Sequence, residues 1–212
     1  MDAAVVVFDG VDELDAVGPY EVLANAATAV AGLRVELVTL APSERVTGSH
    51  GLVLEPGGLL GHRRDLIVVP GGGWNDRAPA GAYAEAVRGD LPAALAELHS
   101  HGSVIASVCT GAMIVAAAGL LRDRRATTHH RAHADLRDAG ARLVEARVVD
   151  DGDIVTAAGV TSGIDLGLWI VERWWGRRLA NAVAGEMEHQ RVMPSAISRA
   201  EGAGRTPLSP DR

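Results

Sequence analysis

Short apolar runs alternate along this chain with segments of helical pattern. Continuous apolar stretches rich in β-branched side chains predict buried strands, and they lie at residues 3–8, 33–40, 65–70 and 104–108. Apolar positions that recur every three to four residues predict helices, which we place at residues 18–29, 91–101, 111–118, 130–139, 162–175 and 179–192. We expect the helix at 18–29 to open on Gly18-Pro19, because proline suits the first helical position.

Two further segments have the pattern of small hairpins. Residues 46–54 are interrupted by the sequence GSHG, and residues 143–149 and 154–157 flank the turn sequence DDG. The alternation of strands and helices predicts an α/β three-layer sandwich with a mostly parallel central sheet, of flavodoxin-like type, to which the hairpins are small additions. No repeat or linker divides the chain, so we expect a single domain over residues 1–193 and a C-terminal tail over residues 194–212.

Composition narrows the range of partners. A net charge of −7 argues against a nucleic-acid partner, which normally leaves a basic face. The single cysteine cannot form an intrachain disulfide, as is usual in a reducing compartment. The first residues carry no cationic leader, so we expect a cytoplasmic location.

The longest uncharged stretch, VIASVCTGAMIVAAAGLL at residues 104–121, raises the alternative of a membrane span. Its first part is β-branched and its second part is rich in alanine, with Ser107, Thr110 and Gly111 between them. This mixed pattern favours a buried strand followed by a buried helix, and we expect no membrane partner.

Unusual residues stand at the ends of three predicted strands. They are Asp12, Glu13 and Asp15 after the first, Gly71-Gly72-Gly73 after the third, and Cys109-Thr110-Gly111 after the fourth. In an open α/β sheet, ligands collect where strands end and helices begin. If the three strands are neighbours, a carboxylate, a run of backbone N–H groups and a thiol meet at one place.

Each of these groups has a chemical use. A cysteine at the start of a helix lies at the positive end of the helix dipole, which favours its thiolate. The glycine run can direct N–H groups at developing negative charge, and Asp15 can transfer protons. Thr110 can orient a water molecule. The ordinary alternatives are a buried cysteine that only packs, a simple glycine turn, and an Asp15 that merely caps a helix.

Other candidate groups favour structural interpretations. His129 and His133 have the spacing of zinc ligands on a helix, with His130 between them, but no HExxH motif or second cysteine completes a site, and we expect no metal. The basic cluster at residues 122–125 is typical of a solvated helix end. Trp169, Trp174 and Trp175 are expected to pack in the core or at a dimer contact.

The assembled pieces resemble the DJ-1/PfpI superfamily, whose fold is similar to that of class I glutamine amidotransferases. The matching pieces are FDGVDELDAVGPYEVLA, VVPGGG, ASVCTGAMIVAAAGLL, RRATTHH and AAGVTSGIDLGLWIVE, which together extend from Phe8 to about Glu172. The combination of SVCTG, RATTH and AGVTSGID resembles one branch, which includes isonitrile hydratases and the sensor halves of some AraC-type regulators.

The resemblance implies roles for individual residues. Cys109 matches the nucleophile, Thr110 the threonine that follows it, and Asp15 the acid of an L-D-x-x-G-P segment. The expected oxyanion and substrate-binding region consists of Gly71, Gly72, Gly73, Gly111 and Val160. The chain has Thr110 where the peptidase and deglycase branch has histidine, which argues against a Cys–His mechanism. It ends at Arg212 where the regulators continue into a helix-turn-helix domain, so we do not expect an intact DNA-binding regulator.

The implied function is cysteine-dependent hydration of an isonitrile to an N-substituted formamide, without a cofactor, in a homodimer. The surface that carries the dimer contact is left open between the tryptophan-bearing helix and the tail. Two alternatives also stay open. One is another cysteine-dependent lyase or hydrolase acting on a small metabolite, and the other is an oxidation sensor or small-molecule-binding regulator without catalysis.

Overall fold

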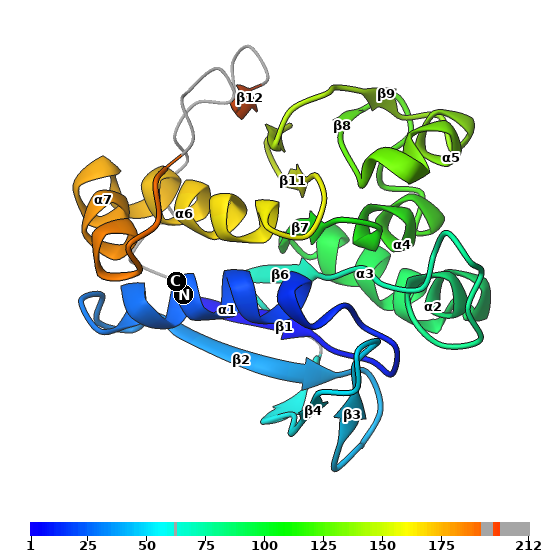
Figure 1. Cartoon of the computed structure of the whole chain (residues 1–212), viewed down its shortest axis with the longest axis horizontal. Coiled ribbons are helices and arrows are strands. Elements are labelled where there is room, and N and C mark those ends of the chain that lie inside the picture. The colour runs from blue at the N-terminus through cyan, green and yellow to red at the C-terminus, as the bar shows by residue number, and fades with distance from the viewer. Residues whose placement is uncertain (62, 192–196, 200–212) are drawn as a thin grey trace.

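The computed structural model describes residues 1–61, 63–191 and 197–199, and its central feature is an eight-stranded sheet (Figure 1). Across the sheet the strands follow in the order β12 (Ile197–Arg199), β10 (Val148–Asp150), β11 (Ile154–Ala157), β7 (Val104–Val108), β6 (Leu66–Val69), β1 (Asp2–Val6), β2 (Arg34–Thr39) and β5 (Gly58–Leu59). All neighbouring pairs are parallel except β10 and β11.

Helices cover both sides of this sheet. One group contains α1 (Glu13–Ala27), α6 (Ser162–Trp175) and α7 (Arg177–Glu186), and the other contains α2 (Ala82–Arg88), α3 (Asp90–Ser100) and α4 (Gly111–Ala117). The central strands β1, β6 and β7 are buried nearly throughout, because both of their faces pack against helices. The predicted α/β sandwich with a mostly parallel sheet is therefore confirmed.

The remaining elements are small additions to the sandwich. The hairpin expected at 46–54 is present as the antiparallel pair β3 (Val46–Thr47) and β4 (Val53–Leu54). The other expected hairpin is the antiparallel pair β10 and β11. Beyond them lie β8 (Arg125–Ala126), β9 (Arg142–Leu143), the short 3₁₀ turn η1 (His130–Ala132) and α5 (His133–Asp138). The strand predicted at 143–149 is wrong as a single element, since it is divided between β9 and β10.

The start of α1 corrects the prediction in a way that matters for the site. The helix begins at Glu13 rather than at Gly18, because the Asp12 side chain accepts the Leu14 N–H and caps it. Pro19 lies inside the helix, where it packs on α6 through Gly163. Asp15 is therefore part of the first helical turn and not of a loop before it.

Two further predictions, on a membrane span and on the C-terminal tail, have different outcomes. No described helix is long and apolar enough to cross a membrane, and the uncharged stretch divides at Cys109 into β7 and α4, as expected. The predicted tail lies mostly outside the described residues. Only 197–199 are described, as the strand β12 paired in parallel with β10.

Trp169 packs in the interior, as was expected. This side chain is 4% exposed, and its Nε1–H donates to Asp150 Oδ2 at 2.9 Å. Asp150 also accepts from Arg173 at 3.1 Å, so a buried carboxylate joins α6 to the β10–β11 hairpin with its charge paired.

Candidate active site

The three predicted strand ends meet at the carboxyl edge of the sheet. Strands β1, β6 and β7 are neighbours, so the residues that follow them are brought side by side. A direct contact joins two of the groups, because the Gly71 N–H donates to Asp15 Oδ2 at 3.0 Å. The Cys109 thiol lies close enough to the same carboxyl for each group to shift the pKa of the other. The expected meeting of an acid, a glycine loop and a thiol is thus present.

Cys109 occupies a tight turn between β7 and α4 with φ of 56°. A positive φ is uncommon for residues other than glycine and is typical of functional sites, where the surrounding structure holds it in place. Here the Cys109 N–H donates to the carbonyls of Ala157 and Ala158 at 3.1 and 2.8 Å, and the Thr128 hydroxyl donates to the Cys109 carbonyl at 2.8 Å. These bonds fix the backbone that presents the thiol.

Gly111 explains how α4 can begin so close to the sheet. A Cβ at this position would overlap the carbonyl oxygen of Val69, the last residue of β6. Glycine, which has no Cβ, therefore allows the helix to approach the strand this closely.

Asp15 is fully buried, and its two oxygens have different surroundings. Oδ2 accepts the Gly71 N–H, whereas Oδ1 has no hydrogen-bond partner among the described residues. Burial, followed by the charge of Asp12, raises the pKa of the Asp15 carboxyl from 3.8 to about 8, although hydrogen bonds from Gly71 and Cys109 oppose the rise. The carboxyl is accordingly protonated in most molecules at neutral pH.

The thiol of Cys109 is also held in its neutral form. Burial, followed by the charge of Asp15, raises its pKa to about 12, while the N–H groups of Val160 and Thr110 hydrogen-bond to the sulfur and work in the opposite direction. The expectation that the helix dipole favours a thiolate is therefore wrong for the free protein. Desolvation of this residue, which is 6% exposed, is the largest of these effects.

The glycine loop is built differently from the expected set of free oxyanion donors. The Gly71 N–H is used by Asp15, and the Gly72 N–H donates to Thr110 Oγ1 at 3.0 Å. A Cβ on Gly71 would lie 2.5 Å from that hydroxyl, so this loop must pack directly on the cysteine turn. The backbone donors at the sulfur are those of Val160 and Thr110. Gly73, with φ of 64°, makes the turn out of the loop.

A hollow of about 520 Å³ lies beside Val160 and the start of α1, and we call it the Val160 hollow. Its lining consists of Asp12, Glu13, Leu14, His50, Leu52 and Val160. Val160 forms the wall nearest to Cys109, since its N–H hydrogen-bonds to the sulfur, and it has a strained φ of 26°. The volume is within the range that small-molecule ligands occupy.

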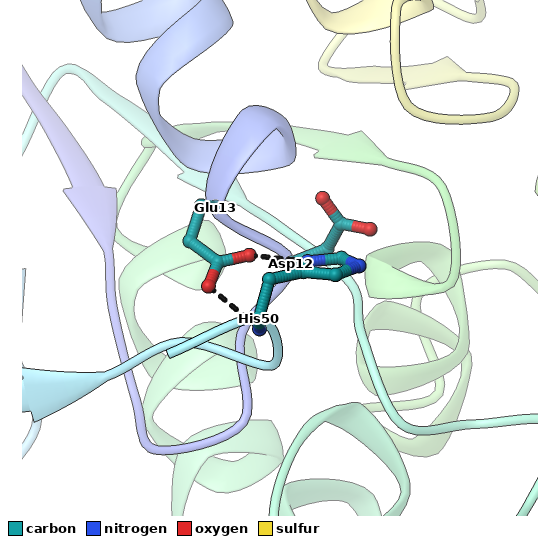
Figure 2. A group of neighbouring side chains, drawn as sticks. All are labelled: Asp12, Glu13 and His50. Carbon is teal, nitrogen blue, oxygen red and sulfur yellow. Dashed lines mark hydrogen bonds and ion pairs between the residues drawn. The ribbon is translucent and has the colours of Figure 1, made fainter. Parts of the chain in front are cut away.

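Two more lining residues, Glu13 and His50, form a hydrogen-bonded pair between different elements (Figure 2). Glu13 begins α1, and His50 lies in the turn of the β3–β4 hairpin. Glu13 accepts the His50 backbone N–H at 2.7 Å and contacts His50 Nδ1 at 2.6 Å. Burial alone would raise the pKa of Glu13, but the hydrogen bonds from His50 and Leu52 outweigh burial and lower this pKa to about 2. The hydrogen bond to Glu13 and the charge of Glu13, followed by the charge of Asp12, raise the pKa of His50. The hairpin is thereby attached to the start of α1 by a charged pair.

These residues form the one group of three candidate metal ligands that converges in the described part of the chain. The ligand atoms of Asp12, Glu13 and His50 lie within 4.8 Å of one another. Asp12 Oδ1 caps α1, and both Glu13 oxygens accept hydrogen bonds from the hairpin. The arrangement is thus that of a hydrogen-bonded hairpin anchor. Residues 129, 130 and 133 are not part of such a group among the described residues.

Comparison with known proteins places this geometry in a family. The profile described as "DJ-1/PfpI family" matches residues 1–173. The chain belongs to the DJ-1/PfpI family. Its relatives include an isonitrile hydratase of Pseudomonas putida, 36% identical over 194 residues that cover 88% of this chain and 78% of the relative. A deglycase of Pyrococcus abyssi is 38% identical over 95 residues, which cover 44% of this chain and 52% of the relative.

A solved structure supports the same assignment. A ThiJ/PfpI family protein from Pseudomonas syringae superposes with a TM-score of 0.79 at 30% identity, covering 91% of this chain and 77% of that protein. The fold and the family resemblance are therefore confirmed. The relatives carry more than one activity in their names, so membership of the DJ-1/PfpI family does not by itself select a reaction.

In this DJ-1/PfpI chain, sequence reasoning treated His129 only as a metal-ligand candidate and did not place it against Gly159. Its Nδ1 accepts the Arg131 N–H, which leaves Nε2 to carry the proton of the neutral ring. Burial, followed by the neighbouring charges of His130 and Arg131, lowers its pKa. The ring packs over Gly159, where a Cβ would lie 2.8 Å from His129 Cδ2. The RRATTHH segment was recognised as a motif, but only the fold shows that it lies beside Val160.

His50 and Thr128 were overlooked as contributors for the same reason, and Glu13 was noted only as one of three neighbouring acids. Each supports the site through contacts with residues distant in sequence, which no local pattern reveals. The three neighbouring acids also have distinct roles that their spacing did not separate: Asp12 caps α1, Glu13 holds the hairpin, and Asp15 faces the thiol.

Proposed function

We propose that this protein is an isonitrile hydratase-like enzyme that adds water to R–N≡C and releases the N-substituted formamide. The observation that carries the proposal is the buried pair of a protonated Asp15 carboxyl and the Cys109 thiol. The 36% identity to an isonitrile hydratase supports the choice of substrate class.

An acid and a thiol at one point suit the chemistry of an isonitrile. Its terminal carbon accepts a proton and then a nucleophile, so both groups must reach the same atom. Asp15 would donate its proton to that carbon, and Cys109 would form the C–S bond while its thiol proton passes to the Asp15 carboxylate. The product is the thioimidate R–N=CH–S–Cys109, with Asp15 again protonated.

Hydrolysis of the thioimidate would use the same carboxyl a second time. Asp15 protonates the imine nitrogen and then accepts a proton from the attacking water, giving R–NH–CH(OH)–S–Cys109. Collapse of this intermediate forms the formamide carbonyl, breaks the C–S bond and returns a proton to sulfur. Thr110 retains its own hydroxyl hydrogen for the water, since it accepts rather than donates in its bond with Gly72. The N–H groups of Val160 and Thr110 stabilise charge on sulfur during both steps.

The substituent R would lie in the Val160 hollow. Leu14, Leu52 and Val160 supply apolar surface there, whereas Glu13 and Asp12 give the outer wall negative charge. We therefore expect neutral apolar substituents to be preferred over anionic ones.

The protonation state of Cys109 also weighs against the oxidation-sensor alternative. Peroxide reacts with a thiolate, and a pKa raised to about 12 leaves little thiolate in the free protein at neutral pH. Deglycation is the second candidate on the strength of the deglycase relative, although Thr110 stands where that branch has histidine. It is tested by incubating the protein with a glyoxal adduct of a thiol or amine.

The test is turnover of a simple aliphatic isonitrile, followed by NMR detection of the formamide. We expect activity in the wild type and none in Cys109→Ala or Asp15→Asn. Ser107→Ala is a matched control, because Ser107 lies two residues before Cys109 on β7 and its buried hydroxyl has no partner in the described structure. Full activity in Cys109→Ala, or none in the wild type, overturns the proposal.

A further inference from the structure

A second hollow, of about 530 Å³, opens at the same edge of the sheet but away from the cysteine turn. It lies against the ends of β1 and β2 and is closed on the other side by α2 and the start of α3, so we call it the β1–β2 hollow. Val7, Phe8, Leu40 and Leu91 give it apolar surface. Neither Cys109 nor Asp15 contributes to its lining.

The polar lining of the β1–β2 hollow is unbalanced in charge. It contains three carboxyls, those of Asp9, Glu85 and Asp90, and one guanidinium, that of Arg88. Glu85 is 7% exposed and accepts from Arg88 at 2.8 Å through Oε1, while the Arg88 side chain is itself half exposed. Burial, and then the nearby Asp90 and Asp9, act against ionisation of Glu85, and only Arg88 favours it. A buried carboxyl in this position lacks a second cation.

An unsatisfied hydroxyl lies in the same lining. Thr39, at the end of β2, is 6% exposed, and its Oγ1 is buried without a hydrogen-bond partner in the described structure. Buried polar atoms of this kind are usually satisfied by a ligand or by water. The hollow therefore combines excess negative charge, an unused hydroxyl and apolar walls.

These features select one class of ligand. The carboxyls of Asp9, Glu85 and Asp90 do not form a converging group of metal ligands in the described structure, in contrast to the cluster at Asp12. They are too widely spaced to surround one metal ion, and the apolar walls would contribute nothing to ion binding. We propose that the β1–β2 hollow is a second binding site, which takes a small organic cation of the primary alkylammonium type.

In this site the ammonium group lies beside Glu85, and its N–H groups donate to the Glu85 oxygen that Arg88 leaves free and to the Thr39 hydroxyl, while Asp9 and Asp90 add negative charge nearby. The alkyl chain covers Phe8 and Leu40. Arg88 is a competitor in this arrangement, because it neutralises part of the same carboxylate. Removal of Glu85 and removal of Arg88 are therefore expected to change the affinity in opposite directions.

The test is isothermal titration of the full chain with hexylammonium chloride at pH 7.5, with the neutral hexan-1-ol as the matched probe. We expect saturable binding of hexylammonium and at least tenfold weaker binding of hexan-1-ol. Glu85→Gln should weaken hexylammonium binding at least tenfold, and Arg88→Gln should strengthen it by threefold or more. Glu186→Gln, which removes an exposed carboxylate on α7, should leave the affinity unchanged.

The location of the site and the chemical class of its ligand are tested with the same protein preparation. Amide NMR shifts on titration should move at Thr39 and Leu40 and not at Val160, which separates this site from the Val160 hollow. If Glu85→Gln fails to fold, Asp90→Asn replaces it and should weaken binding severalfold. Absence of saturable binding, equal binding of hexan-1-ol, an unchanged affinity in the carboxyl variants, or stoichiometric displacement of hexylammonium by Mg²⁺ would each overturn the proposal.

Discussion

Replacement of Asp15 by asparagine should change the pH dependence of stability as well as the activity. The folded protein holds this carboxyl with a pKa of about 8, against 3.8 when unfolded. A group whose pKa is raised on folding contributes stability that is complete below the unfolded pKa and is lost as pH rises towards the folded pKa. The free energy of unfolding of the wild type therefore falls between about pH 4 and pH 8, whereas Asp15→Asn, whose amide is neutral throughout, lacks this fall.

The magnitude follows from the two pKa values. Between pH 5 and pH 9, the Asp15 contribution to the free energy of unfolding falls by about 4 kcal/mol, at about 1.4 kcal/mol for each pH unit below the folded pKa. Asparagine can still accept the Gly71 N–H, so the variant should keep the fold. The difference in unfolding free energy, variant minus wild type, should consequently rise by about 4 kcal/mol over this range.

Urea unfolding at a series of pH values between 5 and 9 measures this difference. Other titrating groups contribute equally to both proteins and cancel. Asp138→Asn, which alters an exposed carboxylate on α5, is the control and should show a constant difference. Parallel stability profiles for the wild type and Asp15→Asn would refute the claim that Asp15 is buried as a neutral acid.

Four further predictions follow from the same structure. The kcat/KM for an isonitrile should fall as pH rises through about 8, because the acid form of Asp15 is consumed, and a flat profile to pH 9.5 would contradict this role. Glu13→Gln should lower the free energy of unfolding at pH 7 by about 1–3 kcal/mol. This deficit should disappear as pH falls from about 4.5 towards 2, because wild-type Glu13 gains its proton there. A deficit that urea titrations show to be independent of pH would be inconsistent with the charged pair. Gly111→Ala should lower the free energy of unfolding by more than about 3 kcal/mol or prevent folding. Gly185→Ala on α7, where an added Cβ meets open space, should leave the melting temperature unchanged or raise it slightly. We also expect a homodimer, so that sedimentation equilibrium should give twice the mass of one chain, whereas the mass of a single chain would exclude it.

The sequence predicted those elements whose pattern is periodic and long. The helix at 162–175 coincides with α6, because its apolar positions recur regularly and Gly176 ends it. The start of α1 was placed five residues late, since Pro19 has the appearance of a helix opener and the cap at Asp12 depends on side-chain geometry. The helix α2 was not predicted at all, because its short, alanine-rich sequence has no apolar stripe.

The composition of the candidate site was more predictable than its electrostatics. Asp15, Gly71 and Cys109 follow neighbouring strands, and the rule that ligands collect at strand ends was enough to bring them together. The thiol's protonation state depends on burial and on the Asp15 charge, neither of which a sequence specifies, so an argument from the helix dipole alone pointed in the wrong direction. The partners of the Gly71 and Gly72 N–H groups depend on α1 and Thr110, and they too required the fold.

The central claim is that the resting site holds a neutral thiol beside a neutral acid, and the single cysteine of the chain permits a direct measurement. Thiolate absorbance near 240 nm, recorded from pH 5 to 11 and corrected with a Cys109→Ser spectrum at each pH, reports Cys109 alone. The account predicts no thiolate at pH 7 and no midpoint below about pH 9. A thiolate that is fully formed at pH 7 would contradict it.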